Sequence, residues 1–385
     1  MVRPFAATIV LVTLGLACAR GALQPVPDDR GGAGGGPTAG TTGSGGAAGE
    51  PPVDDSDAGP PIGNPVGNPS SACPSITTGV NVINPCGRTN SLAFSPDGAL
   101  LAMGTEAARP NVHLWRLADG ARVRDIDGVG GTTYHVEFSP DGKLLAAAGG
   151  YTIEGALGAL PEIVKLWNVA DGSPVMTIPA SCGAYASSAR FSHDGQLLVT
   201  SGMRGPVEIW RVADGALVTK IEYGTTVHNA RFSPDDKLVI LGGVDQRATV
   251  WTVDTGELKL TLTGTADEMA DAAFSPDGRE IATTGANNSL ALWNATSGAV
   301  LQTMAGHNNY VSHVLWMGSD HLISNDWGGT VRFWMRDGRG NFAAAGFWSV
   351  GGQSIGIALS PDQTLLVAGG SDPVTGAGGF VFLPF

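Results

Sequence analysis

Short apolar and alternating stretches, each bounded by turn residues, repeat along the chain from about residue 75 to the C-terminus. An apolar residue followed by Ser-Pro-Asp-Gly closes the first of these stretches at residues 94–98. Pro presets φ for the first corner of a turn, Asp accepts hydrogen bonds from its own backbone, and Gly takes the left-handed position. Similar or worn copies begin at Phe138, Phe191, Phe232, Phe274, Trp316 and Leu359. The pattern predicts a strand and then a tight turn in every copy.

A second recurring stretch is a short apolar strand that ends in tryptophan, as in Val-His-Leu-Trp at residues 112–115. The intervals between these strands are about 42 residues, after a longer first interval of about 52. The tryptophans are Trp115, Trp167, Trp210, Trp251, Trp293 and Trp334, and Leu383 takes their position in a seventh copy. One tryptophan per unit at a fixed register predicts packing between neighbouring units.

The order of these elements predicts the fold. Each unit reads as a strand, the Ser-Pro-Asp-Gly turn, a strand, a variable loop, the strand ending in Trp, a second Gly-containing turn and a fourth strand. Four-stranded units of just over 40 residues are typical of β-propellers. Residues 73–385 have room for seven, so we predict an all-β, seven-bladed propeller. The last unit lacks a fourth strand, and residues 78–83 read as one, so we expect the N-terminal strand to pair into the last blade and close the ring.

The motifs resemble those of the WD-repeat β-propeller family, and the resemblance covers about 310 of the 385 residues. In that family a repeat tends to carry Gly-His before the inner strand and Asp before the Trp strand, and both hydrogen-bond with Ser or Thr and the Trp. Here His307 follows the only such Gly, Asp326 lies slightly out of register in the same blade, and Asp245 has the family position in a blade without Gly-His. The resemblance implies a structural hydrogen-bonding role for His307.

The N-terminus, residues 1–18, reads as a signal peptide. Arg3 precedes an uncharged run that is too short to span a bilayer as a stable helix. Its end, Leu-Gly-Leu-Ala-Cys, resembles the lipobox of bacterial lipoproteins, which implies lipidation of Cys18, although Gly15 stands where Leu is usual. Cleavage at the Ala-Cys-Ala sequence and free secretion is the alternative. Both interpretations predict export, the first to the bacterial cell envelope, with the outer membrane preferred because Ala19 is not Asp.

Residues 19–72 are rich in Gly, Pro and Ser and contain almost no large apolar residue. Such a segment cannot bury enough surface to fold and predicts a disordered linker. About 50 such residues reach roughly 40 Å as a flexible coil. The sequence therefore predicts a propeller held away from a membrane by a tether.

Composition and cysteine content indicate little about a specific function. The net charge is −13 without a run of Lys or Arg, so a nucleic-acid surface is not expected. In an exported protein, Cys73 and Cys86, which bracket a short predicted strand, are the preferred disulfide pair, and Cys182 is then free. The alternative leaves all three unpaired.

The sequence contains no clear catalytic or metal-binding motif. No two histidines have close ligand spacing and no His/Cys cluster exists, so we expect no metal or cofactor, although a site assembled across blades from residues such as His135, His228 and His313 stays open. No nucleophile elbow, phosphate loop or metalloprotease helix is present. The chain is therefore not expected to be an enzyme. The alternative is an exported propeller enzyme, hydrolase- or lactonase-like, with its site at the channel mouth.

The two faces of the predicted propeller differ. The Ser-Pro-Asp-Gly and Asp-Gly turns share one face (the turn face), and variable loops share the other (the loop face). Diverse loops on a rigid frame usually carry binding, so we predict a monomeric scaffold that binds a protein, peptide or envelope polymer there. The alternative is that these loops are tolerated insertions. The predicted binding residues are Tyr151, Glu154, Tyr310, Asp326 and Trp327.

Overall fold

The structure is a computed structural model, and it describes residues 82–84, 88–106, 110–150, 163–183, 185–264, 268–350, 353–371 and 378–384. These residues all belong to the second of two structural units, residues 64–385. The predicted signal peptide and linker lie outside the described residues. So do the predicted site residues Cys18, Cys73, Cys86, Tyr151 and Glu154.

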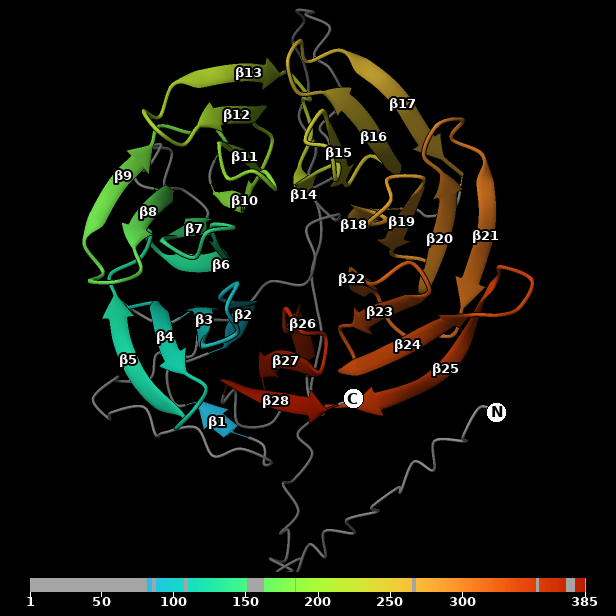
Figure 1. Ribbon diagram of the computed structural model, residues 1–385. Helices are drawn as coiled ribbons and strands as arrows, with labels where there is room; N and C mark the ends of the chain where they lie inside the picture. The colour runs from blue at the N-terminus through green and yellow to red at the C-terminus, as the bar shows by residue number, and fades with distance from the viewer. Residues whose placement is uncertain are drawn as a thin grey trace, which may run out of the picture. The chain divides into compact units, whose positions relative to one another are not determined.

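The strands are arranged in a ring around a central channel, and each sheet extends outward from an inner strand (Figure 1). The inner strands are β2 (Thr89–Phe94), β6 (Thr132–Phe138), β10 (Ala186–Phe191), β14 (Val227–Phe232), β18 (Met269–Phe274), β22 (Val311–Met317) and β26 (Gln353–Leu359). The second strands are β3 (Leu100–Thr105), β7 (Leu144–Gly150), β11 (Leu197–Gly202), β15 (Leu238–Gly243), β19 (Glu280–Gly285), β23 (His321–Asp326) and β27 (Leu365–Ser371). The third strands are β4 (Val112–Arg116), β8 (Val164–Asn168), β12 (Val207–Arg211), β16 (Arg247–Thr252), β20 (Ser289–Asn294), β24 (Thr330–Arg336) and β28 (Gly378–Pro384). The outer strands are β5 (Ala121–Ile126), β9 (Pro174–Ile178), β13 (Leu217–Ile221), β17 (Leu258–Thr263), β21 (Val300–Ala305), β25 (Phe342–Ser349) and β1 (Val82–Asn84).

The prediction of an all-β propeller with four-stranded blades is confirmed. Within the described ranges the strands pair into seven four-stranded sheets, which we number blades 1 to 7, from β2–β5 to the sheet β26-β27-β28-β1. In blade 7 the N-terminal strand β1 pairs antiparallel with β28, and Val82 lies opposite Phe380. The two ends of the propeller sequence therefore meet in one sheet.

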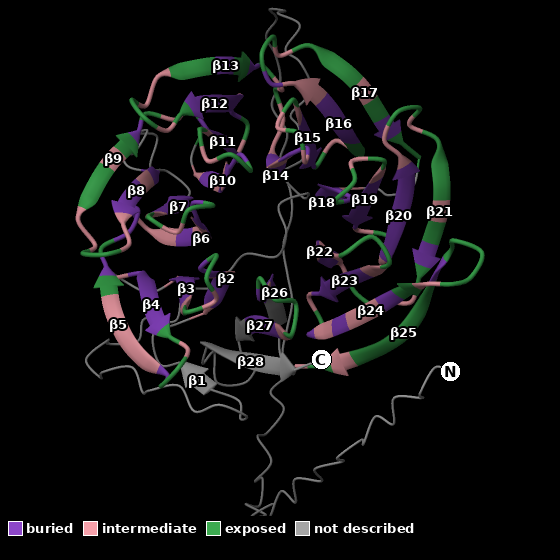
Figure 2. Cartoon of the chain, viewed as in Figure 1, coloured by how far each residue is buried: buried purple, intermediate pink, exposed green. Residues whose placement is uncertain are grey.

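Hydrophobic clusters between neighbouring blades form the core. One cluster joins Val199 and Ile209 of blade 3 to Val227 and Leu241 of blade 4. The second and third strands are covered on both faces, which explains why they read as nearly continuous apolar runs. Figure 2 shows the opposite at the rim, where β13, β17, β21 and β25 are largely exposed. Burial therefore falls from the channel outward.

The recurrent tryptophans lie at the same place in successive blades. Five of them, from blades 1, 2, 3, 5 and 6, are only 1–4% exposed, and Trp251 of blade 4 is half-buried. The indole N–H of Trp293 donates to Thr283 Oγ1 at 2.9 Å, and that of Trp210 donates to Thr200 Oγ1 at 3.0 Å. These positions place the tryptophans in the packing between blades.

The Ser-Pro-Asp-Gly turns have the local hydrogen bonds that their composition suggests. In the first turn the Ser95 hydroxyl donates to Asp97 Oδ1 at 2.6 Å, and the Ala99 N–H donates to the same oxygen at 3.0 Å. The Leu100 N–H donates to Ser95 Oγ at 2.8 Å. Gly98 has φ of 69°, a left-handed conformation that glycine adopts without steric cost. Hydrogen bonds between residues of the same turn therefore define its conformation.

The second turn provides a test of stability against pH. Hydrogen bonds from the Lys143 ammonium and the Ser139 hydroxyl lower the pKa of Asp141 from 3.8 to about 2. A carboxylate with a lowered pKa stabilises the fold above its unfolded-state pKa and loses that contribution as pH falls through the folded value. We expect Asp141→Asn to lower the free energy of unfolding by a constant amount above about pH 5, with the difference disappearing between about pH 4 and pH 2. Chemical denaturation of both proteins measures this, and an unchanged difference at about pH 2 would contradict it.

Candidate functional site

The channel wall is built from two positions of each inner strand. These are the residues three and one before the apolar residue that ends the strand. Because successive side chains of a strand point to opposite faces, these two positions share one face of each inner strand. Four apolar residues at the second position also pack in the hydrophobic clusters between blades, namely Ala93, Ala273, Leu315 and Ala358. The first position holds Ser91, His135, Ser188, Asn229, Asp271, His313 and Gly356, and the second holds Ala93, Glu137, Arg190, Arg231, Ala273, Leu315 and Ala358. Most of them line a cavity of about 320 Å³.

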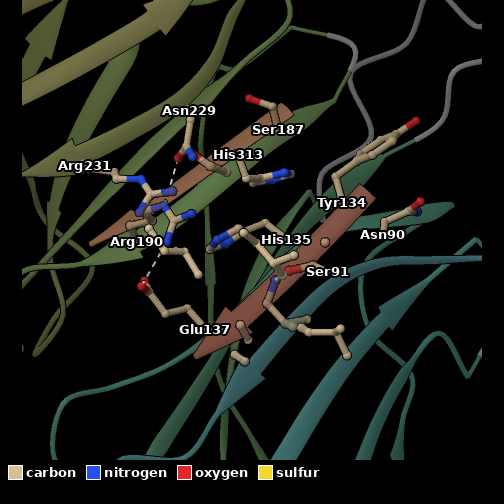
Figure 3. A pocket seen from close by; sticks show the side chains of 18 of the residues that line it. Asn90, Ser91, Tyr134, His135, Glu137, Ser187, Arg190, Asn229, Arg231 and His313 are labelled. Atoms are coloured by element: carbon tan, nitrogen blue, oxygen red, sulfur yellow. Dashed lines mark hydrogen bonds and ion pairs between the residues drawn. The ribbon is translucent and has the colours of Figure 1, made fainter. Parts of the chain in front are cut away.

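A chain of hydrogen bonds crosses the channel side of blades 2 to 5, and Figure 3 shows its part from Glu137 through Arg190 to Asn229. Arg190 Nη1 donates to Glu137 Oε1 at 3.3 Å, and Arg190 Nε donates to Asn229 Oδ1 at 2.8 Å. Asn229 Nδ2 donates to Asp271 Oδ1 at 2.7 Å. Arg231 Nη2 donates to Asp271 Oδ2 at 2.5 Å. The polar side chains of the channel wall therefore connect neighbouring blades by hydrogen bonds.

Asp271 is the centre of that network. Its carboxylate is fully buried and accepts hydrogen bonds from Arg231, from Asn229 and from the backbone N–H of Val314 in blade 6, at 3.1 Å. A buried carboxylate is stable only when it is paired and hydrogen-bonded in this way. Asp271 therefore links blades 4, 5 and 6.

Burial and positive charge govern the ionisation of the channel groups. Burial, aided by the charge of Arg231, lowers the pKa of Arg190 to about 10, although Glu137 and Asp271 oppose the shift. Burial also lowers the pKa of His313 to about 4, with Asp271 opposing and the two arginines adding to the effect. For His135, burial and then both arginines lower the pKa well below its ordinary value. Both imidazoles are therefore neutral at neutral pH.

A second group of side chains, the mouth cluster, lies where the inner strands begin, on the loop face. Glu268 Oε1 pairs with His228 Nε2 at 2.6 Å and accepts from the Tyr310 hydroxyl at 2.9 Å. Tyr310 stacks on Trp327, with ring centroids 4.4 Å apart. The mouth cluster consists of Tyr134, Tyr185, His228, Glu268, Tyr310 and Trp327. It joins blades 4, 5 and 6 by hydrogen bonds.

The other side of the mouth carries the remaining aromatic pair. Tyr134 and Tyr185, which belong to blades 2 and 3, have ring centroids 4.9 Å apart. Burial and the nearby charge of Glu268 raise the pKa of Tyr185. Burial also acts to raise the pKa of Glu268, but the hydrogen bond and charge of His228 and the Tyr310 hydroxyl outweigh it, so that pKa is lowered. A fixed negative charge thus lies among aromatic rings.

Two of the predicted binding residues, Tyr310 and Trp327, lie together in this cluster, but Asp326 does not. Asp326 is 1% exposed, and its carboxylate contacts His307 Nδ1 at 2.7 Å and accepts from the Thr330 N–H at 3.0 Å. A buried carboxylate with two such contacts is not presented to a partner. The prediction of Asp326 as a surface binding residue is therefore corrected to a place inside blade 6.

The same contacts define the role of His307. Its Nε2 lies 2.7 Å from Ser324 Oγ, which accepts from Trp334 Nε1 at 2.9 Å. The side chains of Asp326, His307, Ser324 and Trp334 therefore form one buried hydrogen-bonded set. The position of Asp326 out of register with Trp334 does not prevent it.

Blade 4 has a related set in which tyrosine replaces histidine. The Tyr223 hydroxyl donates to Asp245 Oδ1 at 3.2 Å, and Thr249 Oγ1 donates to the Tyr223 oxygen at 3.4 Å. Trp251 Nε1 donates to Thr249 Oγ1 at 2.8 Å. Asp245 therefore has a hydrogen-bonding role even though its blade has no Gly-His.

Sequence analysis did not single out the charged residues of the channel, Glu137, Arg190, Arg231 and Asp271. A comparison of the repeated inner strands with one another could have indicated them. Residues of neighbouring blades agree at the core positions of the inner strands and differ at the two channel positions. Polar residues inside an otherwise apolar repeated strand indicate a surface that the repeats do not share. Within the described residues, no group of three or more His, Cys, Asp or Glu is arranged to hold a metal ion.

Comparison with known proteins identifies two repeats. The family described as "WD domain, G-beta repeat" matches residues 256–294 and 298–335. Each match begins with the outer strand of one blade and ends with the third strand of the next, so one sequence repeat spans two blades. This offset is the same one by which β1 completes blade 7. The part of the chain that the structure describes contains no helix long and apolar enough to cross a membrane.

Several curated proteins resemble part of the chain. The small ribosomal subunit protein RACK1z of rice is 29% identical over 133 residues, 33% of this chain and 36% of that protein. An uncharacterized WD repeat-containing protein of Synechocystis is 29% identical over 120 residues, 31% of each chain. Telomerase protein component 1 of mouse is 28% identical over 122 residues, 31% of this chain and 4% of that protein. The chain thus spans about a third or less of the length of these relatives.

Proposed function

We propose that this chain, a β-propeller of the WD-repeat type, is a non-enzymatic scaffold that binds a protein or peptide partner on its loop face, with the mouth cluster at the centre of the contact. The observation that carries the proposal is the convergence of four aromatic rings and one carboxylate from blades 2 to 6 at one end of the channel. Tyr and Trp are enriched at the energetic centres of protein interfaces.

The uniformity of the turn face also favours the loop face as the binding surface. On the turn face, the serine and the aspartate of the turn form the same hydrogen bond in six of the seven blades, as in Ser95 to Asp97 and Ser275 to Asp277, both at 2.6 Å. A face of repeated small turns offers little that distinguishes one partner from another. Function on a rigid frame concentrates where the loops differ.

The mouth cluster is also held in place before any partner binds. Tyr310 is fixed by its hydrogen bond to Glu268 and by stacking on Trp327. The backbone N–H of Trp327 also donates to the backbone carbonyl of Tyr310 at 3.0 Å. Side chains ordered in advance lose less conformational entropy on binding, which strengthens an interface of a given area. We therefore place the principal contact at Tyr310 and Trp327.

The cellular setting is part of the proposal and rests on the sequence. The signal segment, with Cys18 as the lipidated residue, and the linker of residues 19–72 would tether the propeller to a bacterial envelope membrane. Intact-mass spectrometry of the mature protein tests this. A chain that begins at Cys18 and carries acyl groups supports the anchor, and an unmodified chain rules it out.

Replacing the mouth aromatics is expected to reduce partner capture. The Tyr310→Ala/Trp327→Ala double variant should lose at least about tenfold in affinity, since a central aromatic at an interface is worth about 2 kcal/mol or more. The measurement is a pull-down from envelope extract, followed by titration of the captured partner. The matched control is His193→Ala, whose side chain is 59% exposed on the turn face. Equal capture by the double variant, the control and the wild type would contradict the proposal.

A further inference from the structure

The channel beneath the mouth cluster gathers basic side chains from four strands. Arg190 and Arg231 extend from the adjacent inner strands β10 and β14, and His135 and His313 extend from β6 and β22. All four line the same cavity of about 320 Å³. In Figure 3 the side chain of His135 points toward the two guanidinium groups, with His313 beside it. Four nitrogen-bearing groups therefore face a space large enough for a small ligand or one side chain.

The arginines are only partly used by the carboxylates beside them. Glu137 accepts from Arg190 Nη1, and Asp271 accepts from Arg231 Nε and Nη2. Within the described residues, Arg190 Nη2 and Arg231 Nη1 have no hydrogen-bond partner. Each guanidinium thus keeps donors that are available to a ligand.

The imidazoles are also incompletely bonded. The Nδ1 atoms of His135 and His313 are buried and have no hydrogen-bond partner among the described residues. The residue His135 is 9% exposed and its Nδ1 atom is buried, so this atom cannot rely on bulk water. A buried polar atom without a partner is unfavourable, and a bound ligand that supplies a hydrogen bond would remove that penalty.

The other charged groups around the cavity leave a positive balance once the imidazoles are protonated. Glu137 on β6 and Asp271 on β18 are matched by the two arginines. Glu268, which precedes β18, adds one carboxylate at the loop-face end of the cavity, where its Oε1 lies 2.6 Å from His228 Nε2 on β14. The remaining side chains described on β2, β10 and β26 that line the cavity carry no charge except Arg190. A ligand that brings one negative charge would balance protonation of an imidazole.

We infer that the central channel binds an oxyanion, the carboxylate or phosphate group of a small acid or of an acidic side chain, between Arg190, Arg231, His135 and His313. Guanidinium groups favour such oxygens because their N–H groups match the spacing of two acceptor oxygens. Burial and, after it, the two arginines lower the pKa of His135 and His313, and an anion bound beside these imidazoles would favour their protonated form and oppose both effects. The inference concerns the channel and does not depend on the partner proposed for the loop face.

Isothermal titration of the folded protein with three probes tests the inference. The probes are sulfate, whose charge does not change in the range used, acetate, and an acetylated hexaglutamate peptide. We expect one site that binds at least one probe, with affinity about tenfold or more higher at about pH 5.5 than at about pH 7.5, because binding takes up protons on the imidazoles. Binding of sulfate or acetate indicates a free small acid, and binding of the peptide alone indicates an acidic side chain.

Substitutions in the channel distinguish binding of the anion there from binding elsewhere on the protein. Arg190→Gln should weaken binding by about tenfold or more. Because that change also breaks the bonds to Glu137 and Asn229, the His135→Gln/His313→Gln double variant serves as the second test, and it should bind more weakly and lose the pH dependence. His193→Gln on the turn face is the control and should bind as the wild type does. Absence of binding of all three probes, or unchanged affinity and pH dependence in the double histidine variant, would overturn the inference.

Discussion

Replacing Asp271 with alanine is expected to lower the free energy of unfolding by about 3–5 kcal/mol, the cost of removing one partner from a buried ion pair. The Asp271 side chain is fully buried, and that of Arg231, its partner, is only 16% exposed. The change would leave the Arg231 guanidinium without its counter-charge. It would also leave the Val314 N–H and one Asn229 N–H without their acceptor. Three blades would lose their common contact at once.

Thermal unfolding measures this effect. For a propeller of about 310 residues, whose unfolding entropy is about 0.65 kcal/mol/K, the expected loss corresponds to a fall in Tm of about 5–8 °C. Asp277→Ala, in the turn of the same blade, is the matched control, because the Asp277 side chain is 44% exposed and its partners are local. A Tm for Asp271→Ala within about 2 °C of the control would show that the channel network does not stabilise the ring.

Deleting residues 75–86 is expected to destabilise the whole propeller by on the order of 3 kcal/mol, from about 1 kcal/mol for each backbone hydrogen bond lost. The deletion removes β1, which pairs three residues with β28 in blade 7. Without β1, the edge of β28 would be exposed and the ring would no longer be joined through both ends of its sequence. The effect should appear as a single cooperative transition at lower temperature, because every blade packs on its neighbours.

The control for this deletion is the removal of residues 19–72, the predicted linker, which leaves β1 in place. That variant is expected to unfold at the wild-type temperature. Differential scanning calorimetry of the three proteins compares them directly. Equal Tm values for the wild type and the protein without residues 75–86 would show that β1 does not contribute to closure.

The repeated parts of the fold were predictable because their causes are local. The turn at residues 94–98 is built from hydrogen bonds between residues two to five positions apart, which the sequence displays directly. The regular interval between the Trp strands then indicates four-stranded blades. The pairing of β1 with β28 was predictable for a related reason, since residues 78–83 resemble the outer strands of other units.

The position of Asp326 was harder to predict. A polar residue at the end of a strand can point to solvent or back into the sheet, and nothing in its immediate neighbours decides between these. The decision comes from His307, 19 residues away, whose imidazole lies 2.7 Å from the carboxylate. The shift of register relative to Asp245 hid a contact that the blade geometry nevertheless allows.

The hydrogen-bond network of the channel was harder still to predict, because its partners are far apart in the sequence. Arg190 and Glu137 are 53 residues apart, and Arg231 and Asp271 are 40 apart. Only the ring brings their strands together, and the rotation of each blade determines which side chains meet. The sequence shows that the channel positions vary between repeats, but which groups pair across blades is a property of the assembled fold.

Binding through the loop face is tested most directly by site-specific photo-cross-linking in native envelopes, with benzoylphenylalanine placed at Trp327 in the mouth cluster or at His193 on the turn face. We expect a discrete cross-linked species with the probe at Trp327 and none with the probe at His193. Mass spectrometry of that species identifies the partner. Cross-linking from His193 with none from Trp327 would contradict the claim that the protein binds through its loop face.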